Sequence, residues 1–374
     1  MAAEPAPLRI GLIGSGFMGR AHALAAALAA RAFDLPRRPE IAVLADAGED
    51  AARRAAGEMG IARWTGDWRM LLDDPGIDVI DITAPNRLHH PMAMAALAAG
   101  KHVCCEKPLA PTLAEAREMR EAAARAGVVT QVGFNYIHNP LFDLAREMIA
   151  SGEIGRVLSY RGQHGEDYMA DPSVPVSFRT EPEGGGVLAD LGSHALATAE
   201  FLLGPIARVS GELVTVHRQR PDGQGGMRAV EVDDIARAGL TFASGAEGHV
   251  EASWVATGRR MAHDFEVFGE RGALVFRGER LNELQVYSAG DGGGRRGFRT
   301  ILTGAEHPPY GRFCPAPGHQ LGFNEIKAIE MARFAEAAAG RRPPPFDFAA
   351  GTRILALTEA IRRAAAQGGW QDAP

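Results

Sequence analysis

The sequence predicts an α/β protein with two domains: a parallel sheet wound with helices over residues 1–134, and an α+β domain with a large open, mostly antiparallel sheet over residues 135–374. Two observations support this division. The first third of the chain alternates short apolar runs with alanine-rich helical stretches, which is typical of right-handed strand-helix-strand crossovers. Over residues 155–288, short β-rich segments instead follow one another across glycine turns, which indicates an antiparallel meander.

In the first domain, short apolar runs predict strands at residues 9–13, 41–45, 79–83, 102–106 and 128–133. Periodic segments between them predict helices at 19–30, 47–59, 91–99 and 113–126. In the second domain, strands are expected at 157–163, 209–217, 235–242, 246–254, 264–268, 273–276 and 283–287, with turns at 221–226 and 290–297. Helices are expected at 188–203 and 324–339, and the last helix of the chain is one that can pack back on the first domain.

A glycine-rich turn follows the first predicted strand. Gly14, Gly16 and Gly19 form a G-x-G-x-x-G frame around Phe17 and Met18, and an alanine-rich helix begins there. Gly14 would allow a tight turn, Gly16 a close approach of the backbone to a pyrophosphate, and Gly19 close packing of helix on strand. Because a helix N-terminus also attracts anions, this segment predicts a dinucleotide-binding Rossmann domain.

The acidic residue after the second strand bears on the choice of cofactor. Asp46 stands where a Rossmann fold places the carboxylate that accepts hydrogen bonds from the ribose hydroxyls, after an insertion at 31–40. This carboxylate would repel a 2′-phosphate, and no arginine follows it directly. NAD is therefore the expected cofactor and NADP is less favoured. The alternative is that Asp46 is a helix N-cap.

Composition and charge restrict the partners. The chain has 374 residues, of which 46% are apolar and 23% charged, and its formal net charge is -6. Scattered Lys and Arg residues give no basic patch for nucleic acid or a membrane surface, and no apolar run approaches the roughly 18 residues of a membrane span. The N-terminus lacks the basic start of a signal peptide, so a cytoplasmic protein with a small-molecule ligand is expected. The three cysteines have neither a disulfide nor a zinc spacing, and no metal is predicted.

Polar residues follow the third strand at the carboxyl edge of the parallel sheet, where ligands bind in such folds. Thr83, Pro85 and Asn86 could line the cofactor, and a plain Pro-Asn turn is the alternative. His89 and His90 come directly after them. Adjacent side chains point apart, so this pair does not predict a metal site.

Glu106 and Lys107 end the fourth strand and precede Pro108. The strand and the proline ring fix the lysine stem, so its ammonium could stabilise a developing alkoxide beside a nicotinamide. A solvated lysine without a chemical role is the alternative.

A second candidate site lies at the glycine-rich entry, residues 184–186, of the predicted helix 188–203. Asp190 and His194 stand four residues apart, which places both side chains on one face. A carboxylate beside an imidazole orients it and raises its basicity, as a general base for an alcohol proton requires. The alternative is an exposed pair worth about 0.3 kcal/mol, which the apolar neighbours Ala195 and Leu196 disfavour.

Together these motifs resemble one family of oxidoreductases. The glycine turn, the run Ala-Pro-Asn-Arg-Leu-His at 84–89, Glu106-Lys107-Pro108, Gly133-Phe134-Asn135-Tyr136 and the Asp190/His194 pair are similar to those of the glucose-fructose oxidoreductase and inositol dehydrogenase (Gfo/Idh/MocA) family. The resemblance spans nearly the whole chain. It implies an NAD(P)-dependent oxidoreductase that acts on CH–OH groups. It also implies a homodimer or homotetramer, because family members associate through their large open sheet.

The resemblance also implies roles for individual residues. Lys107 corresponds to the catalytic lysine of the family, and Asp190 and His194 correspond to its acid/base pair. His194, oriented by Asp190, would take the hydroxyl proton, Lys107 would stabilise the alkoxide, and the substrate carbon would deliver hydride to the nicotinamide. The expected cofactor-binding residues are Gly14, Gly16, Phe17, Met18, Gly19, Asp46, Thr83, Pro85, Asn86, His89, Glu106 and Lys107.

The segments 170–179, 295–300 and 307–310 resemble those of levoglucosan dehydrogenase and its relatives, which oxidise a pyranose C3 hydroxyl. A sugar, an anhydrosugar such as levoglucosan, or a cyclitol is therefore the expected substrate. The strand 157–163 and the loop after it would bind sugar hydroxyls, with a solvated polar loop as the alternative. The expected substrate-binding residues are Lys107, Asn135, Tyr136, His164, Asp167, Tyr168, Arg179, Asp190 and His194.

Two other classes of function stay open. One branch of the family retains NAD and uses transient oxidation to hydrolyse or eliminate a glycoside, and another comprises sugar-sensing regulators that bind a dinucleotide without catalysis. The presence of Lys107, Asp190 and His194 together argues against a sensor. Accumulation of NADH would distinguish a dehydrogenase from a hydrolase or lyase.

Overall fold

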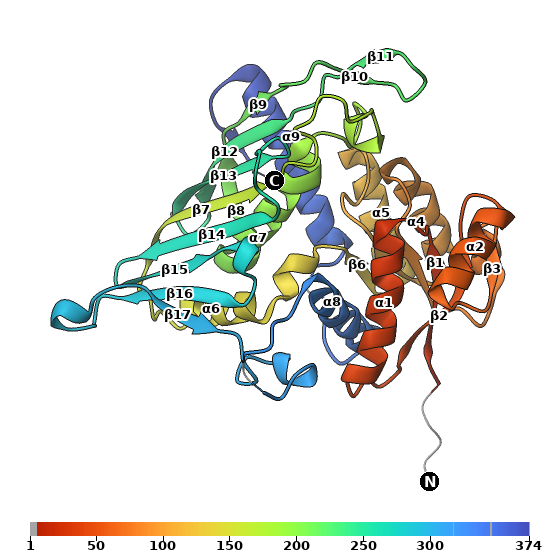
Figure 1. Ribbon diagram of the computed structural model, residues 1–374, viewed down its shortest axis with the longest axis horizontal. Helices are drawn as coiled ribbons and strands as arrows, with labels where there is room; N and C mark the ends of the chain where they lie inside the picture. The colour runs from red at the N-terminus through yellow and green to blue at the C-terminus, as the bar shows by residue number, and fades with distance from the viewer. Residues whose placement is uncertain (1–5, 317, 345, 374) are drawn as a thin grey trace, which may run out of the picture. The chain divides into compact units, whose positions relative to one another are not determined.

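The chain forms two compact units in the computed structural model, which describes residues 6–316, 318–344 and 346–373 (Figure 1). The first unit runs to His138 and also contains Leu321–Thr352, and the second contains Asn139–Gln320 and the chain from Arg353 onward. The first boundary lies close to the predicted one, but Leu321–Thr352 was expected in the second domain. Residues 1–5, which belong to the N-terminus considered above, lie outside the described residues.

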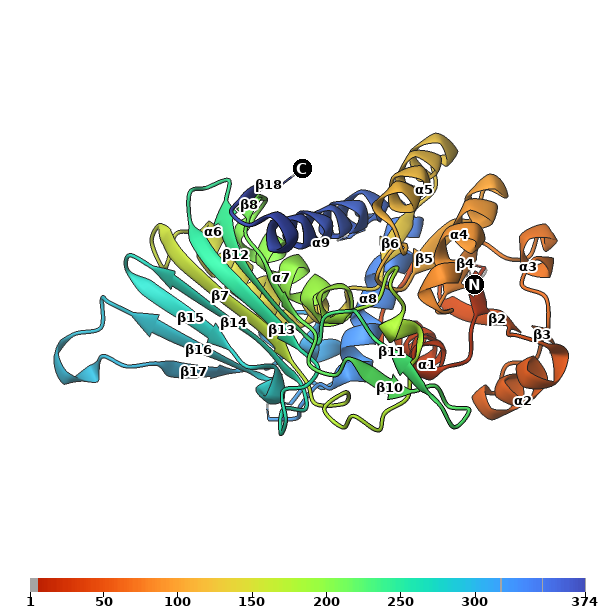
Figure 2. The ribbon, with the colours of Figure 1, turned by 90° about the horizontal axis from the view of Figure 1, so that it is seen from above.

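A parallel six-stranded sheet, in the order β3-β2-β1-β4-β5-β6, forms the centre of the first unit. Helices α1 and α8 lie on one of its faces and α4 and α5 on the other (Figure 2), which is why its strands are apolar on both sides. The strands are β1 (Leu8–Ile13), β2 (Pro39–Ala45), β3 (Trp64–Thr65), β4 (Val79–Ile82), β5 (His102–Cys105) and β6 (Thr130–Val132). The helices are α1 (Phe17–Ala32), α2 (Glu49–Met59), α3 (Met70–Asp73), α4 (His89–Ala98), α5 (Leu113–Ala126) and α8 (Phe323–Ala338).

The predicted helix 113–126 is present as α5, and the structure shows a cap at each of its ends. Helix α5 begins after Thr112, whose hydroxyl accepts a hydrogen bond from the Glu115 amide, and ends at Gly127 with φ +64°. Elements β3 and α3 were missed, because segments of two and four residues carry no readable periodicity.

Helix α8 explains why the segment after residue 320 belongs to the first unit. It packs along α1 and buries Ile326, Ile329 and Phe334. The first turn of α9 (Phe348–Gln367) lies in the same unit, where Thr352 Oγ1 donates to the Ala116 carbonyl at 3.0 Å.

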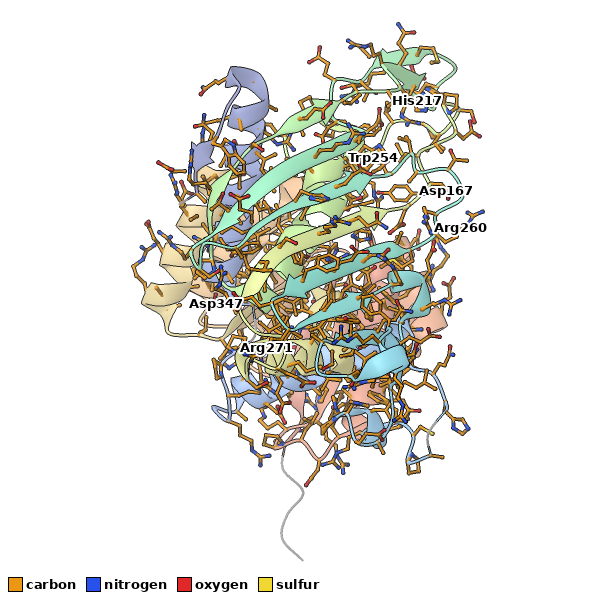
Figure 3. All side chains as sticks on the ribbon, turned by 90° about the vertical axis from the view of Figure 1, so that its left-hand side faces the viewer. Asp167, His217, Trp254, Arg260, Arg271 and Asp347 are labelled. Atoms are coloured by element: carbon orange, nitrogen blue, oxygen red, sulfur yellow. The ribbon has the colours of Figure 1, made fainter. Side chains whose placement is uncertain are left out.

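The second unit contains a ten-stranded sheet, in the order β17-β16-β15-β14-β7-β13-β12-β8-β18, with β9 beside β12. Its described strand pairs are antiparallel except β7 with β13. Helix α7 packs on β7 and β13 and α6 packs on α7, whereas no α-helix of the described chain covers the opposite face (Figure 3). The strands are β7 (Val157–Gly165), β8 (Ile206–Val209), β9 (Glu212–Val214), β12 (Ile235–Phe242), β13 (Glu247–Ser253), β14 (Ala262–Gly269), β15 (Gly272–Phe276), β16 (Glu283–Ser288), β17 (Arg299–Leu302) and β18 (Gln371–Asp372).

Shorter elements complete this unit. Helices α6 (Pro140–Ala150) and α7 (Ser193–Leu203) accompany the sheet, and β10 (Gln219–Pro221) and β11 (Met227–Ala229) form a separate hairpin around the predicted turn 221–226. None of the described helices combines the length and the apolar character that crossing a membrane requires.

Two predicted elements of the second unit differ from the structure. The predicted strand 209–217 is broken between β8 and β9, because Gly211 crosses α9 so closely that an added Cβ would lie 2.3 Å from the Ile361 carbonyl oxygen. The predicted helix 188–203 begins as a π-helical turn, Leu188–Gly192, before α7 starts at Ser193. Such turns occur frequently at functional sites.

Candidate active site

The glycine turn after β1 leaves its backbone accessible at the start of α1. Gly14 has φ +102°, and a Cβ at Gly19 would lie 2.0 Å from the Gly14 carbonyl oxygen, so both positions require glycine. Gly16 is the N-cap of α1 without a side-chain cap, and a Cβ there would meet no described atom within 4 Å. The amides of the first helical turn are therefore available to an anion such as a pyrophosphate.

Asp46 lies beside this turn, directly after β2. Ser15 Oγ donates to Asp46 Oδ2, and the Ala47 amide donates to Oδ1 at 2.6 Å. The N-cap of α2 is Gly48, so the alternative that Asp46 caps this helix is wrong. A carboxylate fixed beside a pyrophosphate-binding turn is suited to the ribose hydroxyls of NAD, and the residues present therefore fit this cofactor.

The loop after β4 supports the same turn. Thr83 Oγ1 lies 3.0 Å from the Ile13 carbonyl and 3.1 Å from the Gly14 carbonyl, so its hydroxyl donates toward the glycine turn. Pro85 precedes a short 3₁₀ helix, Asn86–Leu88. The Pro-Asn turn that was the alternative is present, and contacts of Thr83, Pro85 and Asn86 with the cofactor stay a prediction.

His89 connects two loops at the edge of the sheet. It is buried, with Nδ1 2.8 Å from the Pro108 carbonyl and Nε2 2.9 Å from the Ala84 carbonyl. Burial lowers the pKa of its imidazole. Both ring nitrogens face backbone oxygens, so this residue holds the loops that carry Asn86 and Lys107 and does not itself present a nitrogen to a ligand.

An aromatic cluster lies at the start of α1. Phe17 is 73% exposed, and its ring stacks on Phe323 at 5.6 Å, while the edge of Tyr136 approaches Phe323 at 6.4 Å. Met18 is half-buried beside Phe17. Asn135 is buried, and its Nδ2 has no hydrogen-bond partner among the described residues. Phe323 could not be predicted, because it lies far along the chain from Phe17 and Tyr136, the residues that it contacts.

Glu106 is the best-connected residue of the predicted cofactor site. Its Oε1 accepts hydrogen bonds from His22 Nε2 at 3.0 Å and from Lys327 Nζ at 2.7 Å. Its Oε2 lies 3.3 Å from the backbone nitrogen of Lys107. Burial alone would raise the pKa of Glu106, but Lys327 and His22 hold it well below its usual range. The carboxylate is therefore ionised and fully engaged within the protein.

His22 is held by two carboxylates. Its Nδ1 lies 2.8 Å from Asp81 Oδ2, and Nε2 contacts Glu106. Burial opposes protonation, but Asp81 and Glu106 outweigh it and raise the pKa of His22 to about 9. His22, Asp81 and Cys104 have the spacing of metal ligands, within 4.8 Å of one another. Both nitrogens of His22 contact carboxylates, so His22 and Asp81 form an ion pair, and burial raises the pKa of the Cys104 thiol, which stays protonated.

In the second unit, Asp190 is the centre of the predicted substrate site. Tyr168 donates its hydroxyl to Asp190 Oδ2 at 2.7 Å, and Arg179 Nε donates to the same oxygen at 2.9 Å. The Arg179 guanidinium also lies 5.6 Å from the centre of the Tyr168 ring. Burial and the neighbouring Asp190 raise the pKa of Tyr168, so its phenol is a neutral donor. The structure thus brings together three residues that the sequence predicted at one site.

The π-helical turn that carries Asp190 is fixed by a residue that the sequence analysis missed. Asp233 Oδ2 accepts a hydrogen bond from the Leu188 amide at 2.7 Å, and Arg362 Nη1 lies 3.4 Å from Oδ1. Gly186 has φ +91°, and a Cβ there would lie 2.3 Å from Asp233 Oδ1. The glycine-rich entry is therefore required for this carboxylate to reach the start of the turn.

Three histidine rings lie together beside this turn. His194, on α7, lies 5.6 Å from the ring of His164 and 6.2 Å from that of His263. Burial, and secondarily His164, hold the pKa of His263 well below its usual range, so this ring is neutral. His263 was not predicted, because nothing in its sequence neighbourhood distinguishes it.

Asp167 has a different set of partners. Its carboxylate accepts hydrogen bonds from the Gly258 amide and from Arg260 Nη1, both at 3.1 Å, at the turn between β13 and β14 (Figure 3). It is not among the described partners of Asp190, and its predicted contact with substrate stays a prediction. Lys107 belongs to the first unit, whereas Asp190 and His194 belong to the second.

The glycine turn, the fixed Asp46 and the parallel sheet define an NAD-binding oxidoreductase domain. Residues 8–134 match the oxidoreductase family with an NAD-binding Rossmann fold, and residues 142–275 match the GFO/IDH/MocA C-terminal domain. The chain therefore belongs to the Gfo/Idh/MocA family of oxidoreductases, and its cofactor is NAD.

Individual relatives extend over the whole chain. Levoglucosan dehydrogenase of Pseudarthrobacter phenanthrenivorans is 40% identical over 98% of this chain and 98% of its own length. The scyllo-inositol 2-dehydrogenase (NAD(+)) of Bacillus subtilis is 30% identical over 78% of this chain and 77% of its own. A solved structure of levoglucosan dehydrogenase in complex with NADH and levoglucosan has a TM-score of 0.95 at 41% identity, covering 98% of this chain and 100% of that chain. An inositol dehydrogenase homologue from Azotobacter vinelandii with NADH and myo-inositol has a TM-score of 0.82 at 27% identity, covering 98% of each chain.

The position of Asp46 predicts how the protein distinguishes its cofactors. In Asp46→Ala, the affinity for NADH should fall about tenfold, or about 1.4 kcal/mol, because the ribose loses a charged acceptor. The affinity for NADPH should not fall, because the repulsion of the 2′-phosphate is removed as well. Fluorescence titrations with both nucleotides measure this, with Asp50→Ala on the exposed start of α2 as the control. An unchanged preference for NADH would contradict the role of Asp46.

The raised pKa of His22 predicts a pH-dependent stability. Its folded pKa of about 9 exceeds the unfolded value of 6.5. The stabilisation, about 3 kcal/mol, should therefore be complete below about pH 6.5 and lost as the pH rises through about 9. Urea denaturation at a series of pH values measures this loss. His22→Gln should be less stable at low pH and should lack the decline, and the same decline in both proteins would contradict the assignment.

Proposed function

We propose that the protein is a dehydrogenase that oxidises a secondary hydroxyl, at C3, of an anhydrosugar such as levoglucosan or of a related pyranose or cyclitol. The observation that carries this proposal is the full-length similarity to levoglucosan dehydrogenase, at 40% identity over 98% of both chains. The similarity to inositol dehydrogenases is weaker and supports the wider class of polyol substrates.

NAD supplies the hydride acceptor when bound. In our proposal Lys107, at the end of β5, donates to the substrate oxygen and stabilises the negative charge that develops on it. The peptide that carries Lys107 is held by Glu106 and by the loop that His89 fixes, which supports a role that needs a defined position.

His194 is the proposed base that takes the hydroxyl proton, and Asp190 is the carboxylate that favours its protonated form. Tyr168 and Arg179 donate hydrogen bonds to the half-buried Asp190 carboxylate and fix its position. An ionised carboxylate favours an imidazolium beside it, which is the property that the proposed base requires.

The catalytic assignment predicts a large loss of turnover without loss of folding. In Lys107→Ala and His194→Ala, kcat should fall about 10²–10⁴-fold, whereas the control His90→Ala, on the surface of α4, should keep it. NADH formation with levoglucosan, glucose, inositols and aryl glucosides measures the activity and the substrate together. Release of aglycone without NADH would contradict a simple dehydrogenase and favour a hydrolase or lyase that retains its cofactor.

We further propose that two copies associate through the uncovered face of the large sheet to form a homodimer or homotetramer. Acidic and basic side chains alternate there, including Arg237, which pairs with Glu251 at 2.8 Å and Glu212 at 3.3 Å, and Arg277, which pairs with Glu266. Such a face is complementary in charge to a second copy of itself.

This surface predicts a change of oligomeric state on charge reversal. Arg237→Glu should dissociate the oligomer, because it places a carboxylate beside Glu212 and Glu251. Light scattering on the purified protein measures the mass, with Arg53→Glu on α2 as a control of equal charge change. A monomeric wild-type protein would contradict the proposal.

A further inference from the structure

The largest group of buried charges that the mechanism does not use lies in the first unit. His22, Asp81, Glu106, Lys327 and Glu330 are each at most 5% exposed and are joined by ion pairs. Four elements contribute to it: α1, β4, the end of β5 and α8. Charges so deeply buried persist only when they are paired, and a cluster of this kind at the end of a strand requires an explanation.

Lys327 lies between two carboxylates of the cluster. Its Nζ lies 2.7 Å from Glu106 Oε1 and 2.7 Å from Glu330 Oε2. Burial opposes the charge of this ammonium, but Glu106 and Glu330 outweigh burial and raise its pKa. Burial also raises the pKa of Glu330. Two cations, His22 and Lys327, therefore pair with the carboxylates of Asp81, Glu106 and Glu330.

The Glu106 carboxylate occupies space that the absence of a side chain at Gly133 leaves free. A Cβ at Gly133, after β6, would lie 2.5 Å from Glu106 Oε1 and 2.7 Å from its carboxyl carbon. The φ of Gly133 does not require glycine, so the space for the carboxylate is the reason for this residue. Gly133 belongs to the motif at 133–136, and the proposed mechanism gives it no other role.

The other oxygen of Glu106 connects the cluster to Lys107. The Lys107 amide donates to Oε2 at 3.3 Å, while the Glu106 amide donates to the Ile82 carbonyl at 2.9 Å. The carboxylate therefore spans from the ammonium of Lys327 to the peptide that carries Lys107. A shift of this carboxylate would shift that peptide, and displacements of about 1 Å can cost about 10²-fold in rate.

We propose that Lys327 is a positioning residue for the reaction: its ion pair with Glu106, in the space left by Gly133, fixes the peptide of Lys107. The inference rests on the catalytic role proposed for Lys107. It assigns to Lys327 no contact with substrate or NAD.

The first test removes the charge of Lys327 but keeps the length of its side chain. In Lys327→Met, kcat should fall at least about tenfold, while the dissociation constant of NADH and the KM of the sugar stay within about threefold. The double variant Lys327→Met/Glu106→Gln removes both charges and should recover several-fold of this kcat, because no unpaired charge stays buried.

The second test moves the carboxylate without changing any charge. Gly133→Ala should lower kcat in the same way, since the added methyl group displaces Glu106 from Lys327. Gly57→Ala is its matched control, because a Cβ there meets no described atom within 4 Å. Thr352→Val, which removes a buried hydrogen bond of the same unit, is the control for stability and should keep kcat despite a lower melting temperature.

The outcomes separate the two proposals. If Lys107→Ala abolishes NADH formation but Lys327→Met and Gly133→Ala keep kcat within about threefold, the positioning role is wrong and the function stands. The positioning role is also wrong if the loss of kcat in both variants is explained by a smaller fraction of protein that binds NADH. It is wrong, too, if the double variant is no more active than Lys327→Met. If Lys107→Ala keeps its activity, the catalytic role of Lys107 fails, and the inference fails with it.

Discussion

The ion pair between Glu106 and Lys327 joins the end of a strand to a helix that stands 221 residues further along the chain. Helix α8 reaches this position because its apolar face packs along α1, and Lys327 on the same helix then joins His22 in compensating the buried charge of Glu106. The network thereby joins α1, the end of β4, the end of β5 and α8.

A common principle applies in both units: buried polar side chains hold the backbone of the loops that carry candidate site residues. His89 lies between two loop carbonyls, and Asp233 accepts a hydrogen bond from the first amide of the π-helical turn. Tyr168 and Arg179 then fix the Asp190 carboxylate on that turn. Satisfied networks of this kind make a loop rigid, so the functional groups have defined positions before a ligand arrives.

Local sequence patterns predict part of the fold and part of the candidate site. The glycine turn, Asp46, the helix α5 and the meander follow from periodicity and turn chemistry. Lys327, Asp233 and Phe323 could not be found in this way, because each becomes important only through a contact made by folding. The break between β8 and β9 was missed for a similar reason, since the approach of Gly211 to α9 decides it. The resemblance to a family supplied roles that the residues alone left open.

The network of buried charges depends on the protonation of His22, because Asp81 and Glu106 can both accept a hydrogen bond from this ring only if it is an imidazolium. The ¹⁵N chemical shifts of the histidine side chains, with His22→Gln used for assignment, report how many protons each ring carries. We expect both nitrogens of His22 to stay protonated at neutral pH and to lose a proton only near pH 9. A neutral His22 ring at pH 7 would contradict this structure of the network, since either Asp81 or Glu106 would then face a ring nitrogen without a proton.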